Sequence, residues 1–287
     1  MEKSNKRESC TIRLASINVG TLTERSRDIA ETLKKRRVDT ACVQEMKWKG
    51  AKLRDVGDGY KLIYYGTTVG RNGVGIIVSD SYPDFVNGVQ RVSDRLMSIK
   101  ITEGGDTLRV VCAYAPQCLC TDEMKECFYR DLEALTQKFE ENESILIGGD
   151  FNDHVGSCGD SYERRHGGRG YGTRNEERKM LLSYAEAADL AVVNTFFKKK
   201  DEHLVTYRNG GVATQIDYML MRRKELKNII DAKVIPSDGI APQHRLLVMD
   251  VRLQHRRPVR PMVSLQRIKW WKMTGCETEL QGMVKAQ

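Results

Sequence analysis

The nonapeptide SILIGGDFN, Ser144–Asn152, joins a run of apolar residues to a polar end. The segment Ser144–Gly148 has the length and β-branched content of a buried strand, and Gly148 and Gly149 lead into Asp150 and Asn152. A carboxylate and an amide are therefore expected at the end of a strand that the core holds rigid. Taken alone, an Asp-x-Asn sequence after a strand is more often an ordinary turn than a site.

Other apolar runs in the chain end in the same way. Strand patterns over Thr11–Val19, Thr40–Gln44, Leu108–Tyr114 and Gln215–Met221 each carry a polar side chain at or beside one end. Because strand ends at one rim of a sandwich can converge, these side chains are candidates for a common site. The full set is Asn18, Glu45, Tyr114, Asp150, Asn152, Asn194, Asp217 and His244.

The order of the expected elements indicates the fold class. The strands follow one another in hairpin-like succession, which is not the strict strand–helix alternation of a doubly wound parallel sheet. Two packed, mostly antiparallel sheets flanked by helices fit this order better. The other strand patterns cover Tyr60–Tyr65, Val74–Ser79, Leu96–Thr102, Ala191–Asn194, Leu204–Arg208 and Leu246–Leu253, and helical patterns cover Thr23–Arg37, Asp122–Glu141 and Asn175–Asp189.

We expect one domain between a short polar segment and a basic tail. Residues 1–10 are polar and charged, and neither a repeat nor a domain break interrupts residues 11–253. Residues 254–287 include the basic, proline-broken stretch HRRPVRP near their start. We interpret this tail as a poorly ordered linker or arm.

The composition is that of a soluble protein with an anionic partner. Apolar residues make up 40% and charged residues 30% of the 287 residues, and no apolar run has the length that a bilayer span needs. Lysine and arginine total 47 against 39 acidic residues, a net charge of +8. Such an excess favours a polyanion such as nucleic acid.

The N-terminus and the cysteines indicate the compartment. Met1–Cys10 has no apolar segment of a secretory signal, so the eight cysteines belong in a reducing environment. Their spacing does not predict a zinc site. The basic run Lys34–Arg37 is typical of a nuclear signal, although a solvated helix face explains it better. We expect an intracellular, nuclear protein with no membrane association.

The residue types in the candidate set match the needs of phosphodiester hydrolysis. Magnesium takes oxygen ligands, and Glu45 is the candidate ligand. A base must deprotonate the attacking water, a role for Asp150. Asp217 can fix the tautomer of His244 and favour its cationic form, which would hold the scissile phosphate, while Tyr114 can donate to it.

Each of these residues also has an ordinary structural explanation. Glu45 alone is a surface residue as often as a ligand, His244 alone is more often a satisfied structural histidine, and Asp217 alone can cap a loop. The functional interpretation depends on the occurrence of all of them, in order, beside apolar strands.

Six motifs occur in order along the chain, Ser16–Asn18, Val43–Glu45, Tyr114–Gln117, Gly148–Asn152, Gln215–Tyr218 and Gln243–His244. Together they resemble the motifs of the endonuclease/exonuclease/phosphatase superfamily, which includes DNase I, the exonuclease III-type abasic-site endonucleases and the endonucleases of LINE retrotransposons. The resemblance extends over about Thr11–Leu253. The stretches His166–Gly168, Thr206–Arg208 and His244–Asp250 further resemble the RTE-type retrotransposon endonuclease, in the form found in craniofacial development protein 2-like (bucentaur-related) proteins.

This resemblance implies a DNase I-like fold of the α/β (α+β) class, a four-layered sandwich of two mixed, mostly antiparallel β-sheets flanked by helices. It also implies that Glu45 binds Mg²⁺, with Mn²⁺ as an alternative, and that Asn18 supports the metal.

The same resemblance implies catalytic roles for five residues. Asp150 activates water, Asn152 and Tyr114 contact the phosphate, and Asp217 orients His244.

Two positions depart from the family pattern. Gln243 stands where the superfamily usually has an aspartate that helps to bind metal or tune the site, although glutamine is usual in RTE-type members. Gln117 stands where asparagine is common. We expect Gln243, Gln117 and Asn194 to contribute weakly or through other residues.

The leading hypothesis is a Mg²⁺-dependent phosphodiesterase that acts as a monomer on DNA, an endonuclease of the nicking, abasic-site or LINE-target type and of retrotransposon origin. Gln243 motivates an alternative, a catalytically weak or inactive domesticated domain that binds nucleic acid or protein. A third hypothesis is a phosphatase or phosphodiesterase with a substrate other than nucleic acid. The Arg-rich loop Asp153–Arg174 favours a long polyanion, although a mobile solvated loop explains it equally well.

Overall fold

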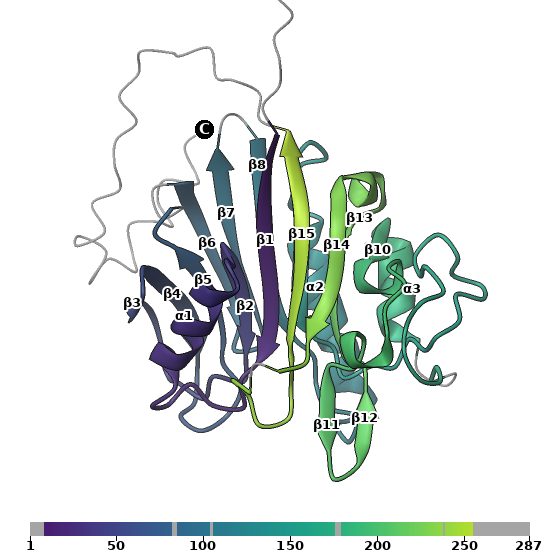
Figure 1. The fold of residues 1–287 in the computed structure, drawn as a ribbon, viewed down its shortest axis with the longest axis horizontal. Coiled ribbons are helices and arrows are strands. Elements are labelled where there is room, and N and C mark those ends of the chain that lie inside the picture. The colour runs from purple at the N-terminus through teal and green to yellow at the C-terminus, as the bar shows by residue number, and fades with distance from the viewer. Residues whose placement is uncertain (1–8, 82–84, 104–105, 176–178, 238, 255–287) are drawn as a thin grey trace, which may run out of the picture. The chain divides into compact units, whose positions relative to one another are not determined.

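The computed structural model describes residues 9–81, 85–103, 106–175, 179–237 and 239–254. The chain divides into the units Met1–Arg257 and Pro258–Gln287, and all described residues belong to the first. Two β-sheets lie face to face, and helices cover their outer faces (Figure 1). None of the helices in these described ranges is long and apolar enough to cross a membrane.

The larger sheet has seven strands in the order β14-β15-β1-β2-β5-β4-β3. Strands β1 and β2 are parallel, and the other neighbours are antiparallel. The strands are β1 (Ser9–Asn18), β2 (Thr40–Gln44), β3 (Gly50–Gly57), β4 (Tyr60–Gly66), β5 (Val74–Ser79), β14 (Ile229–Ile235) and β15 (Leu246–Gln254).

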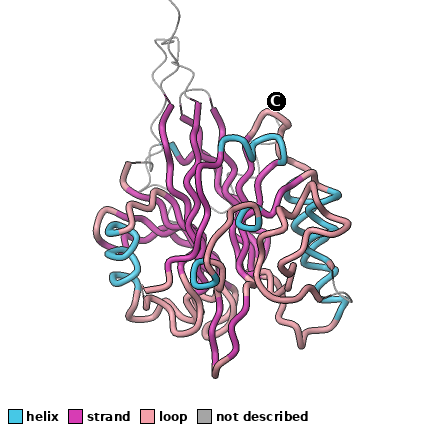
Figure 2. The backbone as a smooth tube through the Cα atoms, turned by 45° about the vertical axis from the view of Figure 1, so that its right-hand side comes forward, coloured by secondary structure: helices cyan, strands magenta, loops and turns pink. Residues whose placement is uncertain are grey.

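The second sheet has six strands in the order β10-β13-β9-β8-β7-β6. Strands β8 and β9 are parallel, and the other neighbours are antiparallel. A separate two-stranded hairpin projects at one rim of the sandwich (Figure 2). The strands are β6 (Val86–Ser93), β7 (Leu96–Glu103), β8 (Asp106–Tyr114), β9 (Ser144–Asp150), β10 (Leu190–Val192) and β13 (Asp217–Arg222), and the hairpin is β11 (Tyr207–Asn209) with β12 (Val212–Thr214).

Apolar side chains bind the helices to the outer faces of the sheets. Helix α1 (Ser26–Lys35) buries Ile29 and Leu33 against the larger sheet. Helices α2 (Asp122–Thr136) and α3 (Met180–Ala187) share a second apolar cluster with the smaller sheet. Each fully buried aliphatic side chain contributes roughly 1.5–3 kcal/mol. Three short 3₁₀ helices complete the described structure, η2 (Val193–Thr195), η3 (Asp201–His203) and η4 (Arg223–Asn228).

A polar seam lies between the two sheets. A Cβ atom at Gly148 would meet Sγ of Cys42 at 3.2 Å and Cβ of Ser16 at 3.4 Å, so glycine lets the sheets approach there. The side-chain amide of Gln44 donates to Oγ of Ser16 at 3.2 Å and to Sγ of Cys112 at 3.3 Å. The contact with Cys112 joins the two sheets just behind one rim, and the contact with Ser16 holds the Gln44 side chain in place.

Strand direction brings the polar strand ends to this rim. Strands β1, β2, β8 and β9 end there, whereas β13 and β15 begin there because they run antiparallel to β9 and β1. The register pairs Asp150 with Asp217 across β9 and β13, and with Tyr114 across β8. Side chains two positions apart on a strand point to the same face. Asn18 and Asp150 therefore face the seam, as Ser16 and Gly148 do.

The mixed, mostly antiparallel sheets with flanking helices confirm the predicted fold class. Four element predictions were wrong in part. Helix α3 spans Met180–Ala187 and not Asn175–Asp189, and the strand predicted over Ala191–Asn194 ends at Val192, directly before η2. Helix α2 was predicted to extend to Glu141 but ends at Thr136. At that end the Thr136 hydroxyl donates to the carbonyl of Leu132 at 3.0 Å. The segment Leu204–Arg208 begins as a turn after η3, and only its last two residues join β11. Most of the predicted polar segment 1–10 and tail 254–287 lies outside the described residues.

Candidate active site

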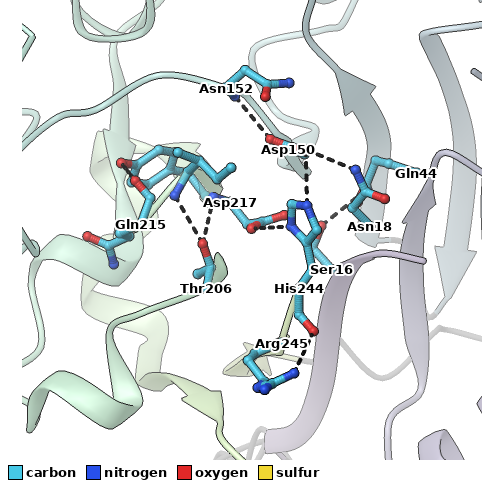
Figure 3. Close-up of polar contacts among 12 residues, drawn as sticks. Ser16, Asn18, Gln44, Asp150, Asn152, Thr206, Gln215, Asp217, His244 and Arg245 are labelled. Carbon is cyan, nitrogen blue, oxygen red and sulfur yellow. Dashed lines mark hydrogen bonds and ion pairs between the residues drawn. The ribbon is translucent and has the colours of Figure 1, made fainter. Parts of the chain in front are cut away.

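The imidazole of His244 lies between two carboxylates at the rim (Figure 3). Its Nδ1 is 3.0 Å from Oδ2 of Asp217, and its Nε2 is 3.8 Å from Oδ2 of Asp150. All three side chains are buried. Asp217 begins β13 of the smaller sheet, and His244 precedes β15 of the larger sheet. The three side chains therefore connect the two sheets at the rim.

Backbone contacts hold Asp217 in place. The hydroxyl of Thr206 accepts hydrogen bonds from the amides of Ile216 at 3.0 Å and Asp217 at 3.1 Å (Figure 3). The amide of Asn194 donates to the carbonyl of Asp217 at 3.3 Å and accepts from the Met219 amide at 3.2 Å. Asn194 therefore braces the start of β13 and acts on the cluster through Asp217.

The segment that carries His244 is fastened to the hairpin strand β11. The amide of Arg245 donates to the carbonyl of Thr206 at 2.8 Å, and the amide of Arg208 donates to the carbonyl of Gln243 at 2.9 Å. The ring of Tyr207 meets the ring of His244 edge to face, with centroids 4.9 Å apart. The histidine ring is thus oriented by its backbone, by an aromatic neighbour and by Asp217.

Asp150 is held by two asparagines. The side-chain amide of Asn18 donates to Oδ2 of Asp150 at 3.0 Å, and the backbone amide of Asn152 donates to Oδ1 at 3.0 Å. Asn152 has a left-handed backbone, φ 48°, and its side chain donates to the carbonyl of Ala115 at 3.0 Å. The Asp-x-Asn sequence is therefore a turn that also links the ends of β8 and β9.

Glu45 and Tyr114 form the outer part of the cluster. Glu45 also has a left-handed backbone, φ 56°, a strained conformation that recurs at functional sites. Its Oε1 lies 3.2 Å from Nζ of Lys47, and its side chain is 23% exposed. Burial and then the carboxylate of Glu45 raise the pKa of the Tyr114 hydroxyl, and the guanidinium of Arg95 lies 4.9 Å from the centre of the Tyr114 ring.

The cluster shifts the pKa values of its members. Burial opposes a charge on His244, but the carboxylates of Asp217, Asp150 and Glu45 outweigh it and raise the pKa of His244 to about 9. Burial, followed by the charge of Asp217, raises the pKa of Asp150 above its ordinary value. Burial and the nearby carboxylates also raise the pKa of the Tyr114 hydroxyl, which stays a hydrogen-bond donor at neutral pH.

The structure does not bring every sequence candidate into the cluster. The side chains of Gln117 and Gln243 are exposed. Both residues make backbone contacts instead. The carbonyl of Gln117 accepts from the amide of Cys120, and the carbonyl of Gln243 accepts from the amide of Arg208.

No role in the site was expected for Thr206, Gln44 or Lys47. Thr206 and Gln44 are polar residues with 0% exposure, and Gln44 ends an otherwise apolar strand. A polar residue at the end of such a strand is the signal that could have identified it.

The oxygen atoms of the cluster suit a hard divalent cation. Asp150, Asp217 and His244 each offer a ligand atom within 4.8 Å of the others, but a cationic imidazole between the two carboxylates competes with a metal there. Glu45 and Asn18 offer a carboxylate and an amide oxygen outside the imidazole. Oδ1 of Asp217 is buried and has no hydrogen-bond partner among the described residues, so this oxygen can still accept a hydrogen bond or bind a cation.

Comparison with known proteins identifies a matching family and several related sequences. Residues 15–238 match the Endonuclease/Exonuclease/phosphatase family. The chain is 28% identical over 255 residues to craniofacial development protein 2 of Bos taurus, an alignment that covers 87% of this chain and 42% of that protein. An uncharacterised 149 kDa protein of transposon TX1 from Xenopus laevis is 31% identical over 81 residues, 28% of this chain and 6% of that protein. The chain thus spans about two-fifths of the length of craniofacial development protein 2.

Solved structures share the fold. The AP endonuclease LMAP from Leishmania major superposes with a TM-score of 0.66 at 13% identity, over 88% of this chain and 90% of that chain. The endonuclease domain of TRAS1, a telomere-specific non-LTR retrotransposon, superposes with a TM-score of 0.60 at 14% identity, over 85% and 99%. At these identities the likeness establishes the four-layered fold, as the resemblance implied.

Proposed function

The chain belongs to the Endonuclease/Exonuclease/phosphatase family, and on that premise we propose that it is a Mg²⁺-dependent phosphodiesterase that cleaves DNA internally. The observation that carries the proposal is the position of His244 between Asp150 and Asp217 at a rim that also presents Glu45. A buried imidazolium flanked by a candidate base suits a phosphate that must be held while water attacks it.

In the proposed reaction the residues of this chain divide the work. Asp150 accepts the proton of the attacking water, and its raised pKa brings it closer to the operating pH, where a general base is most effective. The His244 imidazolium donates to a non-bridging phosphate oxygen, and Asp217 keeps it charged and oriented. Tyr114 and Asn152 offer further donors at the same rim.

Glu45, with the side-chain oxygen of Asn18, would hold the divalent cation. Bound there, Mg²⁺ would supply positive charge beside the scissile phosphate. Manganese takes similar oxygen ligands and is the expected substitute.

DNA is the proposed substrate because the chain carries a net charge of +8, which favours a long polyanion. A craniofacial development protein and a transposon protein among the relatives support a retrotransposon origin. We propose a monomer that acts in the nucleus, where such a substrate is found.

Incubation of the purified full chain with supercoiled plasmid tests the proposal. We expect conversion to the nicked form with Mg²⁺ and none with excess chelator. Faster turnover of a phosphoinositide or sphingomyelin than of plasmid would instead support a phosphodiesterase with a non-nucleic-acid substrate.

One observation favours a second candidate function. Gln243 is exposed and uncharged where the wider superfamily pattern has an aspartate, so the site has one acidic group fewer. A domesticated domain that binds nucleic acid or protein with little cleavage would follow. Plasmid binding without Mg²⁺-dependent nicking would support this candidate over the first.

A further inference from the structure

Two apolar side chains stand out on the rim. Leu119 is 95% exposed and Val69 is 73% exposed, the highest values among large hydrophobic residues in the described ranges. A single exposed apolar residue is ordinary on a protein surface. These two differ because the loops that carry them are tied to the candidate active site.

The loop of Leu119 begins at the catalytic cluster. The amide of Ala115 donates to the carbonyl of Asp150 at 2.8 Å, and the carbonyl of Ala115 accepts from the side chain of Asn152 at 3.0 Å. Ala115 is therefore clamped between two candidate site residues, and the loop starts from a fixed point.

The backbone on both sides of Leu119 is also held. The ammonium of Lys125, whose side chain is only 8% exposed, donates to the carbonyl of Cys118 at 2.9 Å. The amide of Cys120 donates to the carbonyl of Gln117 at 2.9 Å and closes a turn. A buried lysine thus stabilises a turn whose apolar tip points into solvent, an arrangement that contributes nothing to the core.

The loop of Val69 is fastened in a similar way. The amide of Gly70 donates to the carbonyl of Lys47 at 3.0 Å. The side chains of Thr67 and Asn72 donate to Oδ2 of Asp94 at 3.1 and 3.0 Å. Val69 therefore lies on a braced loop beside Lys47, the residue whose ammonium faces Glu45.

The turn 94–95 connects the two loops. Asp94 holds the Val69 loop, and the guanidinium of the next residue, Arg95, donates to the carbonyls of Tyr114 and Ala115 at 3.3 Å each. Both apolar tips thus belong to one rigid section of the rim, next to Glu45 and Asp150.

We propose that Leu119 is a wedge that inserts between neighbouring bases of a DNA duplex, with Val69 supporting the opened step from the adjacent loop. This inference rests on the proposed function, because a phosphodiester at Asp150 and His244 brings the bases of the same nucleotides near these loops. The faces of the bases are the large apolar surfaces that DNA offers, and apolar side chains open base steps in this way. The substrate class is therefore a duplex that must be unstacked locally before cleavage.

Nicking kinetics on two substrates test the wedge. One is an intact duplex, and the other has the same sequence with an abasic site at the cleaved step, where stacking is already lost. For Leu119→Ala in the full chain we expect kcat/KM on the intact duplex to fall about tenfold and on the abasic duplex to stay near that of the wild type, because unstacking limits only the first. Val69→Ala should show the same pattern with a smaller loss. Ile230→Ala is the matched control, since Ile230 is 45% exposed on β14 at the opposite end of the strands.

Fluorescence provides a readout that does not require cleavage. A duplex with 2-aminopurine at the cleaved step should brighten when the wild-type protein binds in chelator, and should not brighten with Leu119→Ala at saturating protein. Equal brightening, or an equal loss of rate on both duplexes, would overturn the wedge while leaving the nuclease proposal intact. A wild-type protein that neither binds nor nicks either duplex would overturn both.

Discussion

Oδ2 of Asp217 and Nδ1 of His244 are 3.0 Å apart although the two residues are 27 positions apart in the chain. Asp217 begins β13 of the smaller sheet, and His244 precedes β15 of the larger one. The contact therefore joins the two sheets at the rim, and it couples the stability of the sandwich to the charge of the imidazole.

Asp217→Asn removes the charge that favours the imidazolium. We expect the pKa of His244 to fall toward its ordinary value and the nicking rate to fall about 100-fold at neutral pH, since a positioned acid or base contributes at least that much. A histidine-specific NMR titration checks the pKa, and plasmid nicking checks the rate. An unchanged His244 pKa in the variant would show that Asp217 does not stabilise the charged ring.

Stability should depend on pH through the same group. The pKa of His244 is raised to about 9 from 6.5, so its contribution is fully present below pH 6.5 and is lost as the pH rises through 9. The loss amounts to at most about 3 kcal/mol. Urea unfolding at pH 6 and pH 9.5 measures it. His244→Gln should lose much less stability over this interval, and equal losses in both proteins would contradict the assignment.

Thr206→Val should disturb the cluster without touching substrate. The valine leaves the buried amides of Ile216 and Asp217 without an acceptor, which costs about 2 kcal/mol or more. We expect a lower unfolding midpoint and a lower kcat with little change in KM. Thr206→Ser keeps the hydroxyl and should restore most of both. If the serine variant behaves like the valine variant, the hydroxyl is not what positions Asp217.

Glu45→Gln tests the proposed metal ligand. The amide keeps the size of the side chain and removes its charge, so we expect nicking to fall on the order of 100-fold or more and the Mg²⁺ concentration for half-maximal rate to rise. Glu31→Gln, on the exposed face of α1, is the matched control. A half-maximal Mg²⁺ concentration equal to that of the wild type would exclude Glu45 as a ligand.

The sequence was informative wherever a strand is buried. The strands β2 and β5 coincide with the predicted ranges, and β9 begins where predicted, because their side chains are almost all buried and their apolar runs are unbroken. Strands β3, β6 and β14 gave no such pattern. All three lie at the edges of their sheets, where most side chains are only partly buried or exposed and polar residues are tolerated.

Several residues of the candidate site and one of their contacts were predictable from the sequence. Polar residues at the ends of apolar strands identified Asn18, Glu45, Asp150 and Asp217. The pairing of Asp217 with His244 was expected from their chemistry, and the two side chains lie 3.0 Å apart. The contact of Asn18 with Asp150 was not expected, because it depends on two strands of different sheets meeting at one rim, which no local pattern records. The exposed wedge Leu119 was not identifiable either, since an exposed leucine in a loop has no signature in a single sequence.

The rate of plasmid nicking by Asp150→Asn tests the central proposal most directly. Asp201→Asn, an exposed aspartate in η3, serves as the control for an aspartate-to-asparagine change. If Asp150 is the base of a Mg²⁺-dependent endonuclease, the wild type and the control nick supercoiled plasmid in Mg²⁺ and stop in chelator, while Asp150→Asn is slower by about 100-fold or more. Nicking by Asp150→Asn at the wild-type rate, or no Mg²⁺-dependent nicking by the wild type, would contradict it.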